Sequence, residues 1–292
     1  MPDIKTVPAS AGAQWLLDAF AVLRKAPLGL GLLGIGWGLL AMAAMLVSMW
    51  VPTLGLALQL VVSLLGPALF AGLLWAVREV DQGRAAQPAH LWQGLRNGRM
   101  PALLSTLLPQ LGAGVVLGLG VLVLVGADGM KQIVEVAEQI QAVQEAGGTP
   151  DPAMVEGLPA GRVLLCLLLA LALVPAVVCL IFVSVPQIIF SGSPGLAAMG
   201  RSLRACLRNL PAMIVFGLLL FITMFALGFA TQIAAMLIQL LFGPAAAVVL
   251  MNLLLMAVLM PLLAGVAYFA WRQMLGEAVT QPPAVDPSRI EL

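Results

Sequence analysis

Few residues in this chain have the chemistry of a metal ligand. The sequence holds one histidine, His90, and three cysteines, Cys166, Cys179 and Cys206, without a Cys-x-x-Cys pair. A metal site needs His, Cys and carboxylate side chains gathered together. His90 stands two residues before Trp92 in a polar segment, which favours a solvated or interfacial imidazole. The cysteines stand in apolar or arginine-rich segments, where thiols behave as small hydrophobic groups. We therefore predict no metal and no cofactor.

The nearest approach to a nucleophile motif is Ser191-Gly-Ser193-Pro-Gly195. A nucleophile elbow requires a glycine two positions before the serine, and position 191 is a serine instead. Glycine and proline at this spacing favour a turn that ends a helix. The sequence also lacks the glycine patterns that hold the phosphates of nucleotides. We predict that the chain is not an enzyme.

Amide side chains are the remaining polar groups of the apolar segments, and two interpretations of them stay open. In one, Gln187, Gln232 and Asn252 line a path for a neutral or amphiphilic solute. In the other, the amides form hydrogen bonds between helices, each contributing about 0.6 kcal/mol. These segments carry no acid, base or histidine, which ion-coupled transporters use as a titratable relay.

The composition shows which kind of protein must position these groups. Of 292 residues, 62% are hydrophobic and 9% are charged, and the mean hydropathy is +1.07. A soluble domain is about 45–50% apolar and about 25% charged, so a soluble globular protein is excluded. The net charge of +1 gives no general attraction to nucleic acid. Four long stretches carry no formal charge at all: 28–77, 100–127, 163–200 and 209–271.

These uncharged stretches predict an all-α, polytopic membrane bundle, because about 20 apolar helical residues cross a bilayer. Proline and glycine interrupt two of the stretches, at Val51-Pro52-Thr53 and Phe242-Gly243-Pro244, where they favour tight turns. The membrane domain therefore covers 28–271. Its six predicted spans are 28–50, 54–77, 101–125, 162–190, 211–241 and 245–271.

The distribution of lysine and arginine predicts the orientation. With six spans, twelve of these residues lie on the side of both termini, and only Lys131 and Arg162 lie on the other. Because cytoplasmic loops are enriched in Lys and Arg, we expect both termini in the cytoplasm. Residues 1–27 then form a cytoplasmic tail with an amphipathic helix, and 272–292 form a disordered cytoplasmic tail. The first apolar run is too long for a cleaved signal.

A pattern of short basic segments suggests three related hairpins. Before Pro27, Pro101 and Pro211 the sequence reads as a short amphipathic helix and a basic elbow. Proline suits the first turn of the span that follows. The second span of each pair contains a further proline, Pro67, Pro175 or Pro261. Arg78 and Arg272 end the first and third of these spans, whereas the second has another proline, Pro186, at the matching position. The alternative is that proline and arginine recur at membrane boundaries without a repeat.

The amphipathic helix before the fifth span predicts a contact with lipid headgroups. At about 100° per residue, Leu196, Met199, Leu203, Cys206 and Leu207 cluster on one face, and Arg201, Arg204 and Arg208 lie roughly 145° away. Such a helix lies in the headgroup plane, where arginines attract anionic lipid. The alternative is that these arginines only determine the orientation of the chain while it is inserted into the membrane. In the corresponding amphipathic helix within residues 1–27, Trp15 is expected to anchor the helix at the membrane interface.

The stretch 126–161 is the one long extracytoplasmic loop. Met130, Ile133, Ala137 and Ile140 repeat at helical spacing, and six acidic residues make the loop acidic. The loop is interpreted either as a cap packed over the mouth of the bundle or as a surface for a protein partner.

Glycines in the spans provide small faces for helix packing: Gly34, Gly38, Gly112, Gly114, Gly118 and Gly120. That packing lies within the monomer or in a dimer, and the oligomeric state stays open.

Two short segments resemble a family of proteobacterial integral membrane proteins. They are Val7-Pro8-Ala9-Ser10 through Trp15 to the Arg24-Lys25-Ala-Pro27 elbow, and Phe70-Ala-Gly72 through Leu91-Trp92-Gln-Gly94-Leu95. The elbow-and-hairpin pattern is more distantly similar to the membrane domains attached to some bacterial glycerophosphodiesterases. The resemblance implies a bacterial inner-membrane protein with six helices and implies no chemistry.

These observations lead to two functional hypotheses. The first is a non-catalytic, multi-pass inner-membrane protein with an envelope or membrane-organising role. The second is a channel or uniporter for a neutral or amphiphilic solute. A water-filled cavity lined by Gln187, Gln232 and Asn252 would favour the second, whereas a filled, dry bundle would favour the first.

Overall fold

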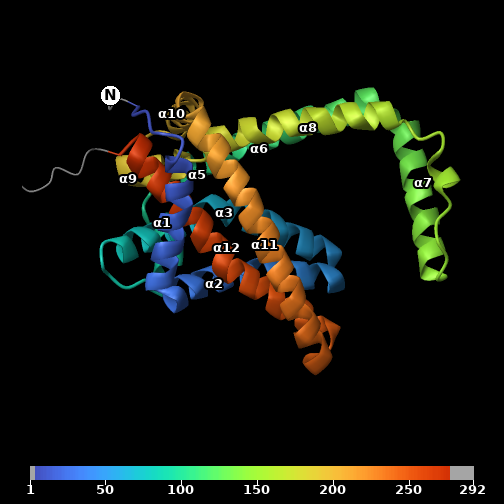
Figure 1. The fold of residues 1–292 in the computed structure, drawn as a ribbon, viewed down its shortest axis with the longest axis horizontal. Helices are drawn as coiled ribbons and strands as arrows, with labels where there is room; N and C mark the ends of the chain where they lie inside the picture. Colours follow the sequence, from blue (N-terminus) through green and yellow to red (C-terminus); the bar gives the residue numbers. More distant parts are fainter. Residues whose placement is uncertain (1–3, 277–292) are drawn as a thin grey trace, which may run out of the picture.

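The computed structural model describes residues 4–276, and all the regular elements within them are helices (Figure 1). Six helical segments are long and apolar enough to cross a membrane, which confirms the predicted all-α polytopic fold. Most of the predicted C-terminal tail lies outside the described residues. The long helices are α2 (Pro27–Trp50), α3 (Pro52–Asp81), α6 (Leu108–Leu124), α8 (Ala160–Ile181), α11 (Leu210–Phe242) and α12 (Pro244–Met274).

Shorter helices connect the long ones. The first, α1 (Ala11–Lys25), precedes α2, and α5 (Met100–Leu104) with η2 (Ser105–Leu107) leads into α6. The others are η1 (Pro88–Trp92), α4 (Gln93–Arg96), α7 (Gly126–Glu145), η3 (Pro152–Val155), α9 (Ser184–Ser191) and α10 (Gly195–Arg208). Proline stands in the first turn of α2, α3, α11 and α12, where its missing N–H group costs nothing.

The predicted fourth span, 162–190, is not one continuous helix. It divides into α8 and α9 at Phe182 and Val183. The reason is Pro186, which cannot donate to the carbonyl oxygen of residue 182 and whose ring would collide with it in a continuous helix. The N–H group of Val183 instead donates to Ser202 Oγ at 3.2 Å. The third span is interrupted in a similar way, because Pro109 in the first turn of α6 follows one 3₁₀ turn.

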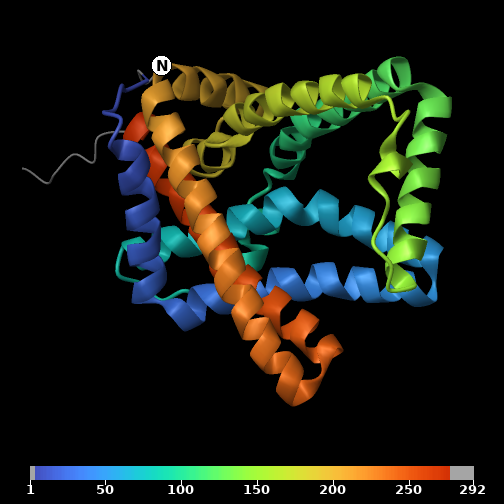
Figure 2. The same cartoon turned by 45° about the vertical axis from the view of Figure 1, so that its right-hand side comes forward.

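The long helices form three antiparallel hairpins that diverge from a common base. The pairs are α2 with α3, α6 with α8, and α11 with α12, and Figures 1 and 2 show each pair leaving the base in its own direction. The accessible surface is 17292 Å², against roughly 11,800 Å² for a compact monomer of this mass. The hairpins therefore leave much surface open toward their tips, although α2 also packs on α12 near Gly34 and Met256.

Three short segments join the hairpins into a closed ring at the base. Here an elbow is the helical segment before a hairpin: α1, then η1 with α4, and then α10. Each elbow packs on the second helix of the preceding hairpin: η1 and α4 on α3, α10 on α8, and α1 on α12. Because α1 belongs to the first hairpin and α12 to the last, the third contact closes the ring.

Close backbone contacts recur at matching positions in this ring. A Cβ atom on Gly12 of α1 would lie 2.2 Å from the carbonyl oxygen of Ala212, and one on Gly195 of α10 would lie 2.6 Å from that of Ala102. Ala212 and Ala102 each follow the proline that begins a hairpin. The hairpins are thus related by contacts as well as by sequence pattern, which supports the repeat.

The N-terminal segment closes the ring through polar contacts. Trp15 is completely buried, and its Nε1 donates to Oε1 of Gln273 at 2.8 Å. The expectation that Trp15 anchors the chain at the membrane interface is therefore wrong. Its ring packs against Phe182 and Phe216 instead. An indole is large enough to fill the gap between hairpins, and its N–H group has a partner there.

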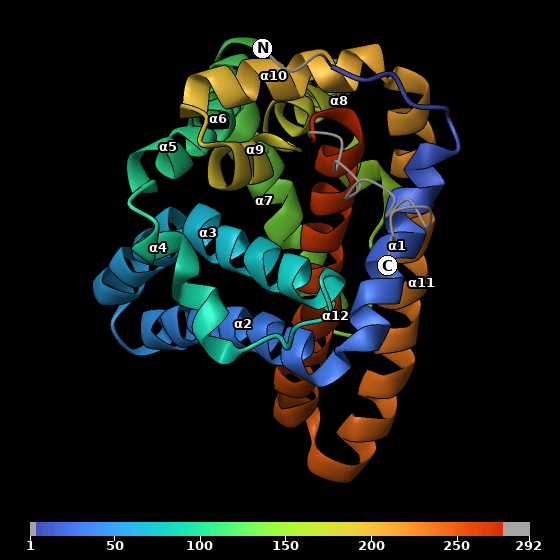
Figure 3. The same cartoon turned by 90° about the vertical axis from the view of Figure 1, so that its left-hand side faces the viewer.

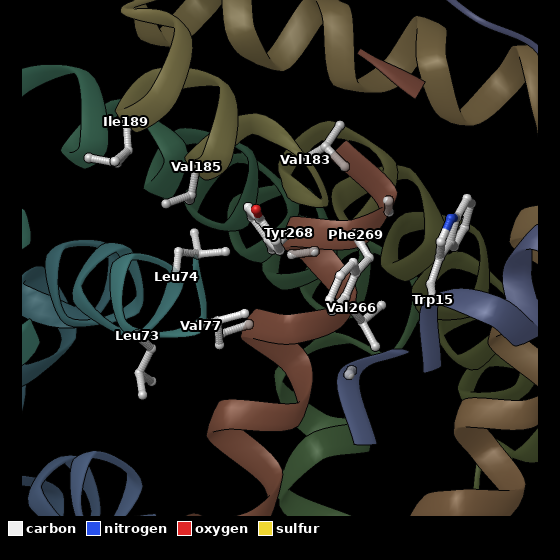
Figure 4. Close-up of a cluster of buried hydrophobic side chains, with 14 of the residues drawn as sticks. Trp15, Leu73, Leu74, Val77, Val183, Val185, Ile189, Val266, Tyr268 and Phe269 are labelled. Atoms are coloured by element: carbon white, nitrogen blue, oxygen red, sulfur yellow. The ribbon is translucent and has the colours of Figure 1, made fainter. Parts of the chain in front are cut away.

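The buried core lies at the base, where elements from all three hairpins meet. Figure 4 shows Leu74 and Val77 of α3, Val185 of α9, and Tyr268 of α12 in this region. The α6–α8 hairpin contributes little to the core, because α6 buries no residue and α8 buries only Cys166. Lipid must cover such apolar surface, since water does not solvate it favourably.

Candidate functional site

A cavity of about 610 Å³ lies where the three hairpins begin to diverge. Its walls come from every hairpin, including Pro67 and Phe70 of α3, Phe182 after α8, Phe216 of α11 and Val266 of α12. Sites for small ligands commonly have about 300–1,000 Å³ and mostly apolar walls. The cavity is therefore of a size and character that suit a hydrocarbon group.

An aromatic cluster lies beside the end of this cavity that is nearest the base. It consists of Trp75, Phe190, Tyr268 and Trp271, with ring centres of neighbouring pairs 5.1–6.2 Å apart. Each of these four residues shares its helix with a residue that lines the cavity. Along that helix, the aromatic residue lies about one turn closer to the base. The guanidinium of Arg78 lies 5.0 Å from the centre of the Phe190 ring and covers the cluster. The cavity thus lies between the buried core of the base and the diverging hairpins.

The cavity wall contains three polar side chains. They are Ser63 of α3, Thr106 of η2 and Gln110 of α6. Thr106 is buried and donates to the carbonyl oxygen of Leu103 at 2.7 Å, so its hydrogen is already used. Gln110 is exposed and offers both an amide donor and an acceptor. The sequence analysis did not single out Gln110. This residue stands nine positions after Pro101, just as Leu220 stands nine positions after Pro211, and both residues line the cavity.

The structure does not gather the three amides that were considered for a solute path. Gln187 is buried at the base, where its Oε1 accepts from Nε1 of Trp271 at 2.9 Å. Asn252 and Gln232 are exposed on the α11–α12 hairpin. At about 1.5 Å per residue, Asn252 lies roughly 28 Å along α12 from Trp271. This separation is close to the thickness of the hydrocarbon core, and none of the three amides lines the cavity.

Gln187 belongs to a polar chain that links three elements of the base. Its Nε2 donates to Ser193 Oγ at 3.3 Å, and Nη2 of Arg201 donates to the same oxygen at 2.8 Å. The chain runs from α12 through α9 to α10. Gln187 is therefore a structural link between helices, as the hydrogen-bonding interpretation expects. The partners are distant in sequence, so the pattern alone could not identify them.

A second polar link joins the first and third hairpins. Arg272, at the end of α12, donates to Oδ2 of Asp81, at the end of α3, at 2.5 Å. Tyr268 donates to the same oxygen at 3.1 Å. The guanidinium of Arg272 also lies 4.8 Å from the centre of the Phe269 ring. The matching positions of Arg78 and Arg272 were visible in sequence, but their different partners were not.

The three arginines of α10 have different surroundings. Arg201 is half-buried and bound to Ser193, whereas Arg204 and Arg208 are exposed. Met199 and Cys206 were expected on the lipid-facing side, but the structure buries both against the protein. The buried face also holds Ala198, Ser202 and Ala205. Small side chains let α10 approach its neighbours closely, which hydrophobicity alone does not predict.

The glycines of the spans divide into two groups. A Cβ atom on Gly34 would lie 2.2 Å from the carbonyl oxygen of Met256, so α2 packs tightly on α12 at this point. Cβ atoms on Gly112, Gly114 and Gly118 would meet no atom within 4 Å. The face of α6 that carries these three glycines is thus open. Gly34 allows another helix of the same chain to pack closely, whereas Gly112, Gly114 and Gly118 do not contact another helix.

The remaining candidates are the metal ligands and the predicted extracytoplasmic loop. No group of three or more His, Cys, Asp and Glu side chains is arranged there to hold a metal. No residue of α7 is fully buried, and this helix mainly contacts α6 and η3, so α7 is not packed over the mouth of the bundle. Comparisons of the chain with protein-family models, curated proteins and solved structures find no match.

Proposed function

We propose that this multi-pass membrane protein is non-catalytic and organises membrane lipid by holding the hydrocarbon chain of an amphiphile between its hairpins. The observation that carries the proposal is the apolar cavity of about 610 Å³ with walls from all three hairpins. Because α6 and α8 pack mainly on each other and on short helices rather than on the other long helices, the cavity is open to membrane lipid beside the α6–α8 hairpin. An acyl chain in it would replace the missing contacts between the hairpins.

The position of the aromatic cluster favours binding over conduction. A channel needs a continuous polar path, and the packed rings of Trp75, Phe190, Tyr268 and Trp271 offer none beside the cavity. Gln187, one of the three amides considered for a polar path, has its amide bound to Trp271 and Ser193. These contacts would have to break for a solute to pass.

A uniporter for an amphiphilic solute is the second candidate. One observation favours it, namely that Gln110 and Ser63 place polar groups in an otherwise apolar wall. Such a wall suits a solute with a hydrocarbon part and a neutral polar part. Flux of a labelled amphiphile in proteoliposomes, faster than in protein-free liposomes, would support transport. Retention of lipid without flux would support the organising role.

The proposed location is the bacterial inner membrane with both termini in the cytoplasm. Reporter fusions after residues 90, 205 and 285 should then give cytoplasmic signals, and a fusion after residue 145 should give a periplasmic signal. Arg78, Arg99, Arg201 and Arg272 all lie near the base, in agreement with the enrichment of arginine on the cytoplasmic side. A cytoplasmic signal at residue 145 would contradict the orientation.

Lipid retention by the purified full chain tests the organising role. Gly66 lines the cavity, and the nearest atom to an added Cβ is Cζ2 of Trp37 at 3.9 Å, so Gly66→Leu fills the cavity without a collision with backbone. The wild type should retain tightly bound lipid after extensive washing in detergent, and Gly66→Leu should retain less. Gly114→Leu is the matched control, because position 114 is open. Equal retention by Gly66→Leu and the wild type would contradict the proposal.

A further inference from the structure

The exposed side of α10 divides into an apolar sector and a basic sector. Leu196, Leu207 and Leu210, which follows the helix, are 69%, 58% and 48% exposed. At about 100° per residue along α10, Leu196 and Leu207 lie roughly 20° apart on one side, whereas Leu210 begins α11. Arg204 and Arg208 are also exposed and lie roughly 100° around the helix axis from the leucines. The third side, centred on Ser202, is buried against the protein.

The orientation of α10 relative to α11 and α12 is the one expected of a helix at the boundary of a membrane. Figure 3 shows α10 lying across the end of the molecule, crosswise to α11 and α12. It ends at Arg208, and α11 begins at Leu210. A helix that lies crosswise at the start of a span is parallel to the membrane surface. Its leucines can then enter the hydrocarbon while its arginines stay among the headgroups.

The two exposed arginines have no acidic partner in the described part of the chain. The ion pairs between residues 4 and 276 join Arg84 to Glu79, Lys131 to Glu135 and Arg272 to Asp81. Arg204 makes a local bond from Nε to the carbonyl oxygen of Gly200 at 3.1 Å, and its side chain is otherwise exposed. Arg201 differs, because it is bound to Ser193 within the base.

We propose that the outer face of α10 binds an anionic phospholipid, with Arg204 and Arg208 on the headgroup phosphate and Leu196 and Leu207 in the acyl region. This surface lies outside the inter-hairpin cavity, so it does not depend on the proposed function. An anionic lipid fits better than a zwitterionic one, because two adjacent cations without acidic partners attract net negative charge. Arg201 is excluded from the site, since its guanidinium supports the base.

Binding of single lipids to the purified full chain, measured by native mass spectrometry, tests this assignment. The probes are phosphatidylglycerol and phosphatidylcholine with identical acyl chains. The double variant Arg204→Gln/Arg208→Gln should bind phosphatidylglycerol roughly 25-fold more weakly, at about fivefold per arginine. Its affinity for phosphatidylcholine should not change. Added salt should weaken the preference of the wild type for phosphatidylglycerol.

Two further variants distinguish attraction by charge from a structural role of the arginines. Arg204→Lys/Arg208→Lys keeps both charges and should restore most of the preference for phosphatidylglycerol. Arg201→Gln should keep that preference while lowering thermal stability, because it removes the bond to Ser193. An unchanged affinity for phosphatidylglycerol in the double Gln variant would overturn the proposal. So would an equal loss for both lipids, or a loss of preference confined to Arg201→Gln.

Discussion

Asn209 and Arg99 occupy matching positions, because each stands two residues before the proline that begins a hairpin. Each side chain binds the backbone of the segment that leads into the next elbow of the ring. Oδ1 of Asn209 accepts from the N–H group of Val7 at 2.7 Å, before α1. Nη1 of Arg99 donates to the carbonyl oxygen of Ile188 at 2.6 Å, before α10. The ring is therefore held by polar contacts to backbone at its joints, in addition to apolar packing.

The first prediction concerns the joint at Asn209, which is 1% exposed. Asn209→Ala leaves the N–H group of Val7 and the carbonyl oxygen of Lys5 without their partner. A buried polar group without a partner costs about 1–3 kcal/mol, so the thermal unfolding temperature in detergent should fall. Asn252→Ala is the matched control, because Asn252 is exposed, and it should have little effect. Equal effects of the two changes would show that the N-terminal joint does not stabilise the ring.

The second prediction concerns the elbow that packs on α3. A Cβ atom on Gly94 would lie 2.1 Å from the carbonyl oxygen of Ala68, so Gly94→Ala must push α4 away from α3. Overpacking of this kind costs typically about 1–3 kcal/mol. Gly112→Ala is the control, because its Cβ would meet no atom within 4 Å and alanine favours a helix. Thermal unfolding should show the first variant destabilised and the second unaffected or stabilised, and the reverse order would contradict the packing.

The third prediction separates a structural amide from an amide in a solute path. Gln187→Leu removes the acceptor for Nε1 of Trp271 and should lower stability by about 1–3 kcal/mol. Gln232→Leu should not, because Gln232 is exposed on α11. The measurement is thermal unfolding of both purified variants beside any solute flux in proteoliposomes. Loss of flux in both variants at unchanged stability would favour a path through these residues.

The fourth prediction concerns the Cys206 thiol of α10. Burial raises the pKa of this thiol, and the neighbouring Cys179 thiol raises it further. Since the thiolate is the reactive form, a raised pKa leaves little of it at pH 8. In a variant with Cys206 as its only cysteine, iodoacetamide should react slowly at pH 8, faster as the pH rises, and rapidly once the chain is unfolded. Rapid labelling of the folded chain at pH 8 would show that the thiol is accessible and ionised.

The sequence was sufficient to predict the six spans and their pairing, because uncharged length and the turns at Pro52 and Gly243 are local features. It was not sufficient to predict the break in the fourth span, although Pro186 was visible, because proline is tolerated in many membrane helices. The structure shows that Ser202 of α10 provides the partner for the N–H group of Val183. This partner lies on another element, so it could not be read from the local sequence.

The candidate site was harder to predict than the fold. Of the two open interpretations of Gln187, its contact with Trp271 agrees with hydrogen bonding between helices, whereas Gln110 in the cavity wall was not distinguished from the other amides. On α10 the predicted apolar face contained Met199 and Cys206, which pack on protein, beside Leu196 and Leu207, which are exposed. Lipid and protein interiors are similarly apolar, so hydrophobic periodicity could not separate these two environments.

Photo-crosslinking tests the central claim, that a lipid chain occupies the inter-hairpin cavity, most directly. The probe is a phosphatidylcholine with a diazirine near the end of one acyl chain, mixed with the full chain in nanodiscs. We predict labels on cavity residues such as Phe70, Phe182 and Phe216, and their loss in Gly66→Leu but not in Gly114→Leu. Labels confined to outward residues such as Val115 and Leu119 of α6, or cavity labels that persist in Gly66→Leu, would contradict the account.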